Sequence, residues 1–317
     1  MKLVRCFQEC FSLKQVMNLL YSENENAHGI SQEETIELQN ALIDVLSEIM
    51  DVCNKYDIRP FLQGGTLLGK VRHNGFIPWD DDLDLGMSRR DYERFKGVFE
   101  KELADRYILK VPNSPYGTSN RFMQIFRKET TYITVGANDD IPQNIYIDIF
   151  PIDYVPENAI ACKLKGWRSN FLMIMASCAE FRQHMSPSLQ KLMLSNKQGR
   201  INYRVRMFLG WLVSFRSLNQ WFDAVDSCIC REKESALCTS ATGRKHYLGE
   251  IVDSNVFFPL KKTEFCGIPT WTLNDPDGYL RNLYGSTYME IPPEEKREHH
   301  FIEKLDISTL EHRHSVK

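Results

Sequence analysis

The stretch Pro78-Trp-Asp-Asp-Asp-Leu-Asp-Leu-Gly-Met87 places four carboxylates inside an apolar frame. In an extended strand alternate side chains share a face, so Asp80, Asp82 and Asp84 should point the same way and the leucines between and after them into a core. Same-face residues lie roughly 6.6 Å apart along a strand, so mutual repulsion favours a cation at this edge. The stretch therefore predicts a buried strand with an acidic edge.

A hard divalent cation, Mg²⁺ or Mn²⁺, suits this edge because such ions bind through a few carboxylates plus substrate phosphates. A solvated acidic turn after Pro78 is the alternative that the stretch alone leaves open. A calcium loop of the EF-hand type is set aside. Counting from Asp80, Leu85 stands where that loop needs glycine, and Asp91 stands where it needs a bidentate glutamate.

A glycine pair precedes the acidic stretch. The run FLQGGTLLG (61–69) predicts a short apolar strand that ends at Gly64 and Gly65 and continues into a helix. Adjacent glycines let the backbone approach a ligand, and the start of a helix presents N–H groups to an anion. Most glycine pairs are only turns, but this one is placed so that its turn would hold phosphate while the next strand holds metal.

Four runs of the sequence resemble the LicD family of phosphotransferases, which belongs to the nucleotidyltransferase-fold superfamily together with fukutin and fukutin-related protein. They are GGTLLGKVRH (64–73), GFIPWDDDLD (75–84), YIDIFPID (146–153) and YGSTYMEIPP (284–293), with Arg297 and the pair His299-His300 beyond. The resemblance implies a small mixed sheet with flanking helices.

The resemblance also implies site residues. Asp82 and Asp84 are similar to the family's metal-binding pair and Asp148 to its third carboxylate, so these three are the expected catalytic and metal-binding residues. The sequence around Asp148 agrees, since isoleucines at 145, 147 and 149 alternate with it along a predicted strand. The expected substrate-binding residues are Gly64, Gly65, Thr66, Arg72, His73, Trp79, Asp80, Arg297 and His300.

Several of these assignments have a structural alternative. Arg72 is expected to clamp phosphate oxygens, although an arginine after a helix also suits the surface. Trp79 is placed to stack on a base or to contact a quaternary ammonium group, or else to fill the core. Arg297 and His300 rest on the resemblance alone, because paired histidines near a chain end are usually solvated.

The activity that the resemblance implies is metal-dependent transfer of a substituted phosphate from a nucleotide diphosphate to a hydroxyl of a cell-surface glycan or glycolipid. The family's typical donor is CDP-choline, which leaves CMP; ethanolamine, ribitol and glycerol donors stay open. One alternative is an Asp-x-Asp glycosyltransferase, although few residues precede the motif. The other is a non-enzymatic metal-stabilised binding module, against which the presence of all three acids argues.

Composition places the chain among globular proteins. Of its 317 residues 43% are hydrophobic and 26% charged, which suits one large domain or two smaller ones. No apolar run reaches the roughly 18 residues of a spanning helix, and the start lacks a signal-peptide core. Nine cysteines without a Cys-x-x-Cys pair favour reduced thiols and a cytoplasmic location. A zinc fragment at Cys228, Cys230 and Cys238 is disfavoured by poorly spaced histidines.

The predicted class is α/β or α+β, in four parts. A helical extension covers 1–30, a catalytic core 31–160, a basic helical insertion 161–240 and the C-terminal part of the catalytic domain 241–317. Ser31 and Glu34 form a predicted capping box. Further helices are expected near 88–100, 163–183 and 200–230, and strands near 80–86, 121–127 and 145–150.

The insertion is strongly basic. Between Cys162 and Phe222 ten Lys and Arg residues accompany one acid, Glu180, giving this segment a net charge of +9 within a chain of net charge −3. Basic helices rich in aromatic residues suit an anionic membrane surface or a phosphorylated glycolipid, here at the inner face of the membrane. The alternative is an apolar face that packs on the catalytic core. Nucleic acid is not an expected partner, because no recognised reader motif is present.

Overall fold

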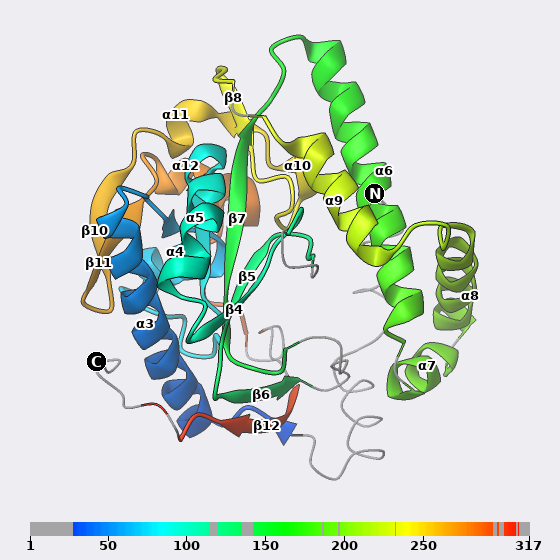
Figure 1. Ribbon diagram of the computed structural model, residues 1–317, viewed down its shortest axis with the longest axis horizontal. Helices are drawn as coiled ribbons and strands as arrows, with labels where there is room; N and C mark the ends of the chain where they lie inside the picture. Colours follow the sequence, from blue (N-terminus) through cyan, green and yellow to red (C-terminus); the bar gives the residue numbers. More distant parts are fainter. Residues whose placement is uncertain are drawn as a thin grey trace.

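The fold is built on a mixed sheet with the strand order β10-β11-β2-β3-β7-β5-β4 (Figure 1). The computed structural model describes residues 28–114, 119–134, 142–185, 187–195, 197–231, 233–293, 297, 301–308 and 310. The strands on this path are β2 (Phe61–Leu62), β3 (Asp84–Ser88), β4 (Tyr107–Lys110), β5 (Met123–Arg127), β7 (Tyr146–Tyr154), β10 (Lys261–Phe265) and β11 (Ile268–Thr272). The pairs β3-β7 and β11-β2 are parallel, and the other neighbours are antiparallel.

The sheet buries the apolar residues that the sequence pattern assigns to it. Ile145, Ile147 and Ile149 are fully buried, as their alternation predicts, and Leu85 and Met87 of β3 lie in the same core. The strand that holds the acidic stretch is shorter than predicted. It begins at Asp84, and residues 80–83 form a loop that leads into it. Only the last of the predicted same-face acids is therefore a strand residue.

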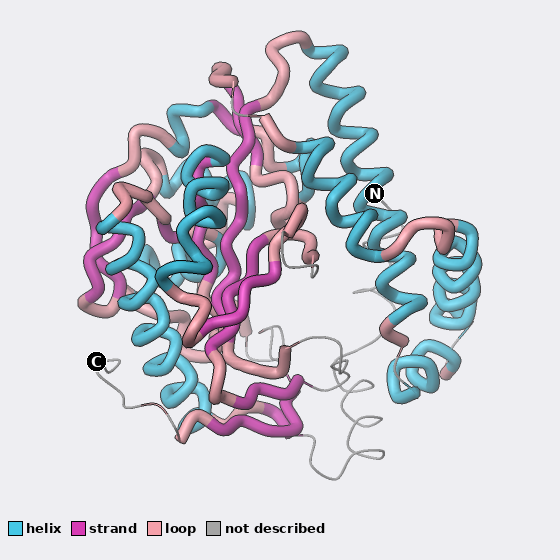
Figure 2. The backbone as a smooth tube through the Cα atoms, in the orientation of Figure 1, coloured by secondary structure: helices cyan, strands magenta, loops and turns pink. Residues whose placement is uncertain are grey.

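Helices flank the sheet (Figure 2). They are α3 (Gln32–Lys55), α4 (Gly64–His73), α5 (Arg89–Glu102), α10 (His246–Gly249), α11 (Ser254–Phe257) and α12 (Pro276–Tyr284). The predicted capping box begins α3: the Ser31 hydroxyl accepts from the Glu34 N–H, and the Glu34 carboxylate accepts from the Ser31 N–H. Ser88 caps α5 in the same way through the Asp91 N–H. Both predicted helix starts are confirmed, as is the predicted fold class, a mixed sheet flanked by helices that is consistent with α+β.

Two small sheets complete the strands. One has the order β1-β12-β6, from His28–Gly29, Phe301–Asp306 and Thr131–Thr134, so residues 301–302 pair with the first described residues, 28–29. In the other, β8 (Leu237–Thr239) pairs with the end of β7 and with β9 (Val252–Asp253). Residues 1–27, which hold most of the predicted helical extension, lie outside the described part of the chain.

The basic insertion forms four helices beside the sheet: α6 (Ala159–Gln183), α7 (Pro187–Leu194), α8 (Lys197–Leu212) and α9 (Leu218–Ile229) (Figure 1). The predicted single helix near 200–230 is wrong. One helix, α8, ends at Leu212, and a separate helix, α9, begins at Leu218, because Ser217 and Gln220 form a second capping box there. No helix among the described residues combines the length and the apolar content needed to cross a membrane. The predicted domain limits stay a prediction.

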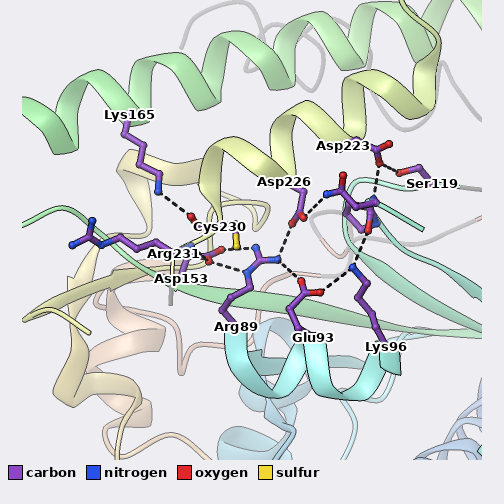
Figure 3. A network of polar contacts seen from close by, with 12 residues as sticks. Arg89, Glu93, Lys96, Ser119, Asp153, Lys165, Asp223, Asp226, Cys230 and Arg231 are labelled. Atoms are coloured by element: carbon purple, nitrogen blue, oxygen red, sulfur yellow. Dashed lines mark hydrogen bonds and ion pairs between the residues drawn. The ribbon is translucent and has the colours of Figure 1, made fainter. Parts of the chain in front are cut away.

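A buried arginine fastens the insertion to the sheet (Figure 3). Arg89 of α5 donates two hydrogen bonds to Asp153 of β7, at 2.9 and 2.7 Å, and one to Asp226 of α9 at 2.8 Å. Asn113 donates a further bond to Asp226 at 2.9 Å. Buried charges of this kind are tolerated only when each finds partners. The network therefore fixes α9 against the core.

Candidate active site

Four polar residues form a row across the middle of the sheet. Asp84 of β3 lies opposite Asp148 of β7 in the parallel pairing, and Asp148 lies opposite Gln124 of β5. Residues directly opposite each other on neighbouring strands project from the same face of a sheet, about 5 Å apart. The backbone N–H of Gln63 extends the row by donating to the Asp84 carbonyl at 3.1 Å. Strand pairing thus brings two of the three predicted catalytic acids together.

The glycine pair is pressed against these acids. Gly64 has a φ of +55°, and a Cβ at this residue would lie 2.6 Å from a carboxylate oxygen of Asp84. A Cβ on Gly65 would lie 3.1 Å from a carboxylate oxygen of Asp80. Glycine is needed at 64 both for its left-handed backbone conformation and for this close approach. The pair lets the start of α4 sit directly over the carboxylates.

Thr66 has a structural contact here. Its buried side-chain oxygen accepts a hydrogen bond from the Asp84 N–H at 2.8 Å, which ties the first turn of α4 to the start of β3. The predicted substrate contact of Thr66 stays a prediction.

A cavity of about 250 Å³ opens over this arrangement. Asp80, Asp82 and Asp84 line it together with Gly64 and Gly65. It also contains residues that the sequence analysis did not select: Gln63, Phe150, Gly243, Arg244, Glu250, Tyr279, Leu283 and Tyr284. Gln63, Phe150 and Tyr284 lie within runs that the sequence had already singled out, FLQGGTLLG (61–69), YIDIFPID (146–153) and YGSTYMEIPP (284–293). For Gly243 and Arg244 the sequence signal is the Gly-Arg-Lys run at 243–245.

Burial and mutual repulsion raise the pKa of the acids in the row. The pKa of Asp84 stands well above its usual value, chiefly through burial and then through the charges of Asp82, Asp148 and Asp80. Burial also raises the pKa of Asp148 to about 7, against the opposing effect of a 2.8 Å hydrogen bond from Gln124. Ionising all of these groups together is unfavourable unless positive charge enters the site.

Arg244 and Glu250 bring a second polar group to the cavity from the segment after the insertion. The Arg244 guanidinium lies 5.7 Å from the ring centre of Tyr284. Glu250 accepts from the Lys245 N–H at 2.8 Å, and burial raises its pKa to about 7. Its second oxygen and the side-chain oxygen of Gln63 are buried without a hydrogen-bond partner. These two acceptors match ligand groups that carry N–H or O–H donors.

Three of the predicted substrate-binding residues cluster beside the cavity rather than in its lining. Arg72 donates to the backbone carbonyls of Tyr288 and Glu290 at 3.1 and 3.2 Å and to His73 at 2.9 Å. The ring of Trp79 lies 6.0 Å from the Arg72 guanidinium. These contacts hold the end of α4 to the segment after α12.

Arg297 completes this cluster, with its guanidinium 4.2 Å from the ring centre of Trp79. His300 lies outside the described residues. Among the described residues, no three His, Cys, Asp or Glu side chains converge as a ready metal site, at the acidic stretch or at the cysteines near 230.

Comparison with known proteins agrees with this geometry. Residues 57–198 match the family described as LicD/FKTN/FKRP, nucleotidyltransferase domain, a range that contains β2, α4, β3 and β7. The Lipopolysaccharide cholinephosphotransferase LicD of Haemophilus influenzae is 27% identical over 273 residues, 86% of this chain and 97% of that protein.

Two further relatives match over shorter ranges. The human Ribitol 5-phosphate transferase FKRP is 41% identical over 68 residues, 20% of this chain and 14% of that protein. The Uncharacterized protein RP689 of Rickettsia prowazekii is 26% identical over 133 residues, 35% of this chain and 45% of that protein. Residues 57–198 are therefore similar to the nucleotidyltransferase domain of the LicD family.

Proposed function

We propose that the chain transfers a substituted phosphate from a nucleotide diphosphate to a hydroxyl of a glycan or glycolipid. The observation that carries this proposal is the pairing of Asp84 with Asp148 beneath the glycine-lined start of α4. Transfer of a phosphoryl group needs charge stabilisation and positioning more than covalent chemistry by the protein. The relatives named as transferases of phosphocholine and of ribitol 5-phosphate support this reaction class.

The donor is proposed to occupy the 250 Å³ cavity. Its phosphates would meet the N–H groups at the start of α4 and the guanidinium of Arg244. The unpartnered oxygens of Gln63 and Glu250 would accept hydrogen bonds from the nucleoside. CDP-choline is the proposed donor, since the cholinephosphotransferase relative matches over nearly its whole length, whereas the ribitol phosphate transferase matches over a short segment.

Mg²⁺ or Mn²⁺ is the proposed cofactor. The charge of the acids suits such an ion, although the three carboxylates do not already converge as a ready site. Asp82 and Asp148 raise the pKa of Asp84, and Asp82 raises that of Asp148, so a bound cation would relieve this repulsion. These three residues would hold the ion, with the remaining ligands supplied by substrate and water. When bound, a divalent cation neutralises charge on the donor pyrophosphate and on the departing CMP.

Asp148 is the proposed general base. A carboxylate whose pKa lies near 7 can accept a proton from an attacking hydroxyl at neutral pH. Gln124 fixes its orientation by donating to one of its oxygens at 2.8 Å, which leaves the other oxygen for the substrate.

The acceptor is proposed to enter from the other side of Asp148. A second cavity of about 310 Å³ lies there, and its lining includes Gln124, Phe126, Tyr132 and Tyr146. Aromatic faces beside a few amides and hydroxyls suit a sugar ring with its polar edge. Phe122 of the second cavity contacts Phe150 of the first, with ring centres 4.4 Å apart.

The test is release of CMP by the purified protein. We expect CMP from CDP-choline in the presence of Mg²⁺, slowly to water and faster with a lipopolysaccharide or lipid-linked glycan acceptor. CDP-ribitol, CDP-glycerol and a UDP-sugar are run in parallel, with an Asp105→Asn variant as a surface control. Turnover of the UDP-sugar alone would support the glycosyltransferase alternative. Donor binding without turnover of any substrate would support a binding module.

A further inference from the structure

The helical insertion exposes a regular apolar row on α6. Ile160, Leu164, Trp167 and Phe171 follow the spacing of one helix face, and each is more than half exposed. The opposite face of α6 carries the residues that pack inward, among them Cys162, Gly166, Ser169 and Met173. The exposed row is therefore a second apolar face, additional to the one that builds the core.

A second row follows the same spacing on α8. Ile201, Val205, Phe208 and Leu212 are exposed, and Phe215 continues the row just beyond the helix with 73% of its surface accessible. The inward face of α8 is close-packed: a Cβ on Gly210 would lie 2.5 Å from the Cys178 carbonyl of α6. The two helices lie side by side (Figure 1), so the rows belong to one helical unit.

Basic side chains accompany both rows. Lys163 and Arg168 are exposed on either side of the α6 row, and Lys197, Arg200 and Arg204 are exposed along α8. The segment's one acid, Glu180, is bound to Arg121 of the core at 2.6 Å and does not offset these charges.

Two other basic residues of the segment turn toward the protein. Lys165 donates to the Cys230 carbonyl at 3.4 Å, and Arg206 donates to the Ser177 hydroxyl at 3.2 Å while covering the ring of Phe181 at 4.9 Å. Five exposed basic side chains of the segment therefore accompany the apolar rows, and Arg182, Lys191 and Arg216 are exposed elsewhere on it.

We propose that the outer face of α6 and α8 lies on a membrane surface that contains anionic lipid. Nine large apolar side chains in two helical rows exceed the scattered exposure that is normal for a soluble surface. Aromatic rows bordered by Lys and Arg are the composition of helices that lie in the membrane interface. The membrane would cover the rows with acyl chains and pair the basic groups with lipid phosphates.

The charge of this face favours an anionic membrane over a second copy of the chain as its partner. Pairing this face with itself would bring two segments of net charge +9 together, and like charges across an interface oppose association. An anionic lipid surface has the complementary charge. Placement at a membrane also suits a lipid-linked acceptor, because Glu180 of α6 lines the proposed acceptor cavity.

The experiment is co-sedimentation of the full chain with phosphatidylcholine vesicles and with vesicles that also contain phosphatidylglycerol. We expect binding to the anionic vesicles at 0.1 M salt and release at 1 M, where the Debye length falls from about 10 to about 3 Å. Each basic group contributes about fivefold to partitioning, so the triple change Lys163→Gln, Arg168→Gln and Arg204→Gln should weaken binding about 100-fold. Replacing Trp167, Phe171 and Phe208 by Ser should abolish binding to the vesicles.

The matched control is the triple variant Arg90→Gln, Lys101→Gln and Lys262→Gln. It removes three exposed charges from the surface of the catalytic domain and should leave vesicle binding unchanged. Equal loss in this control, equal binding to both vesicle types, or no binding would overturn the proposal. In the last case, a dimer in light scattering that disappears with Trp167→Ser would assign the face to a second copy. CMP release in water should be equal in all variants, so failure here is distinct from failure of the proposed reaction.

Discussion

Asp84 and Asp148 come from distant parts of the sequence and face each other across the parallel pair β3-β7. Gln124 on the far side of Asp148 and the glycine pair over Asp84 enclose them. Burial and neighbouring negative charges raise the pKa of both acids, so ionising them together is unfavourable without a cation.

Removing one acid should abolish turnover and preserve the fold. Asp82→Asn or Asp84→Asn changes side-chain volume little but removes a proposed metal ligand, with an expected loss of several kcal/mol of transition-state stabilisation. Calorimetric titration with Mn²⁺ should show weaker binding as well. Without metal, Asp84→Asn should raise the melting temperature, because it removes a charge that its neighbours destabilise. Normal rates at saturating Mg²⁺ would contradict the metal assignment.

Asp148 should make both stability and rate depend on pH. Folding raises the pKa of its carboxyl from the usual 3.8 to about 7, so the folded state binds this proton more tightly than the unfolded chain. Its contribution to the free energy of unfolding is fully present below pH 4, falls as the pH rises toward 7 and levels off above. Asp148→Asn should remove this slope in metal-free urea titrations at a series of pH values.

The catalytic rate should rise with pH over the range in which the stabilising contribution of Asp148 falls. The base must be ionised, so kcat should rise with pH as Asp148 loses its proton, at a pH below its metal-free pKa of about 7 because the bound cation favours the carboxylate. Asp148→Asn should depress kcat far more than donor affinity. Glu250→Gln serves as the matched control, because burial raises the pKa of Glu250 to about 7 as well. If Glu250→Gln removes the pH dependence of kcat and Asp148→Asn does not, the general base would be Glu250.

Substitution of Arg244 should weaken donor binding, whereas substitution of Arg72 should lower the stability of the fold. Arg244→Gln should raise the donor KM by about tenfold or more, since it removes a charge-assisted contact to phosphate worth about 1.5 to 3 kcal/mol. Arg72→Gln should instead lower the melting temperature, because Arg72 holds the carbonyls of Tyr288 and Glu290. The opposite pattern would restore Arg72 as the phosphate clamp.

A substitution in the second cavity should impair transfer to the glycan acceptor without impairing hydrolysis of the donor. Phe122→Ala should raise the KM for the glycan acceptor by removing a partly exposed aromatic face, while hydrolysis of the donor in water stays near normal. Phe208→Ala, which removes an aromatic ring of the exposed α8 row, is the control in a detergent-solubilised assay. Equal loss of hydrolysis and transfer in Phe122→Ala would show that this side chain supports the catalytic row structurally.

The buried arginine should be a major determinant of stability. Arg89→Met leaves Asp153 and Asp226 buried without their cationic partner, which should cost about 3 to 5 kcal/mol in the free energy of unfolding. Arg94→Met, at an exposed position of the same helix, should cost about 1 kcal/mol or less. Urea denaturation of the two variants gives the comparison. Similar losses would show that the network is not what fastens α9 to the sheet.

The sequence by itself determined the features that local chemistry encodes. The capping box at Ser31, the alternation around Asp148 and the glycine pair each depend on neighbours within a few residues, and each appears in the structure as an element of the predicted type. The acidic run becomes a strand only from Asp84. The family resemblance depends on the same short runs, so it too could be recognised before the fold was known.

Only the tertiary structure decided which side chains meet. Arg72 and Arg244 look alike in the sequence, yet one is bound to backbone carbonyls and the other lines the cavity. Lys163 and Lys165 are two residues apart, but the turn of α6 exposes one and directs the other to Cys230. Such outcomes depend on strand pairing and helix packing between distant segments, and no local pattern specifies those contacts, because their energy exists only once the chain has folded.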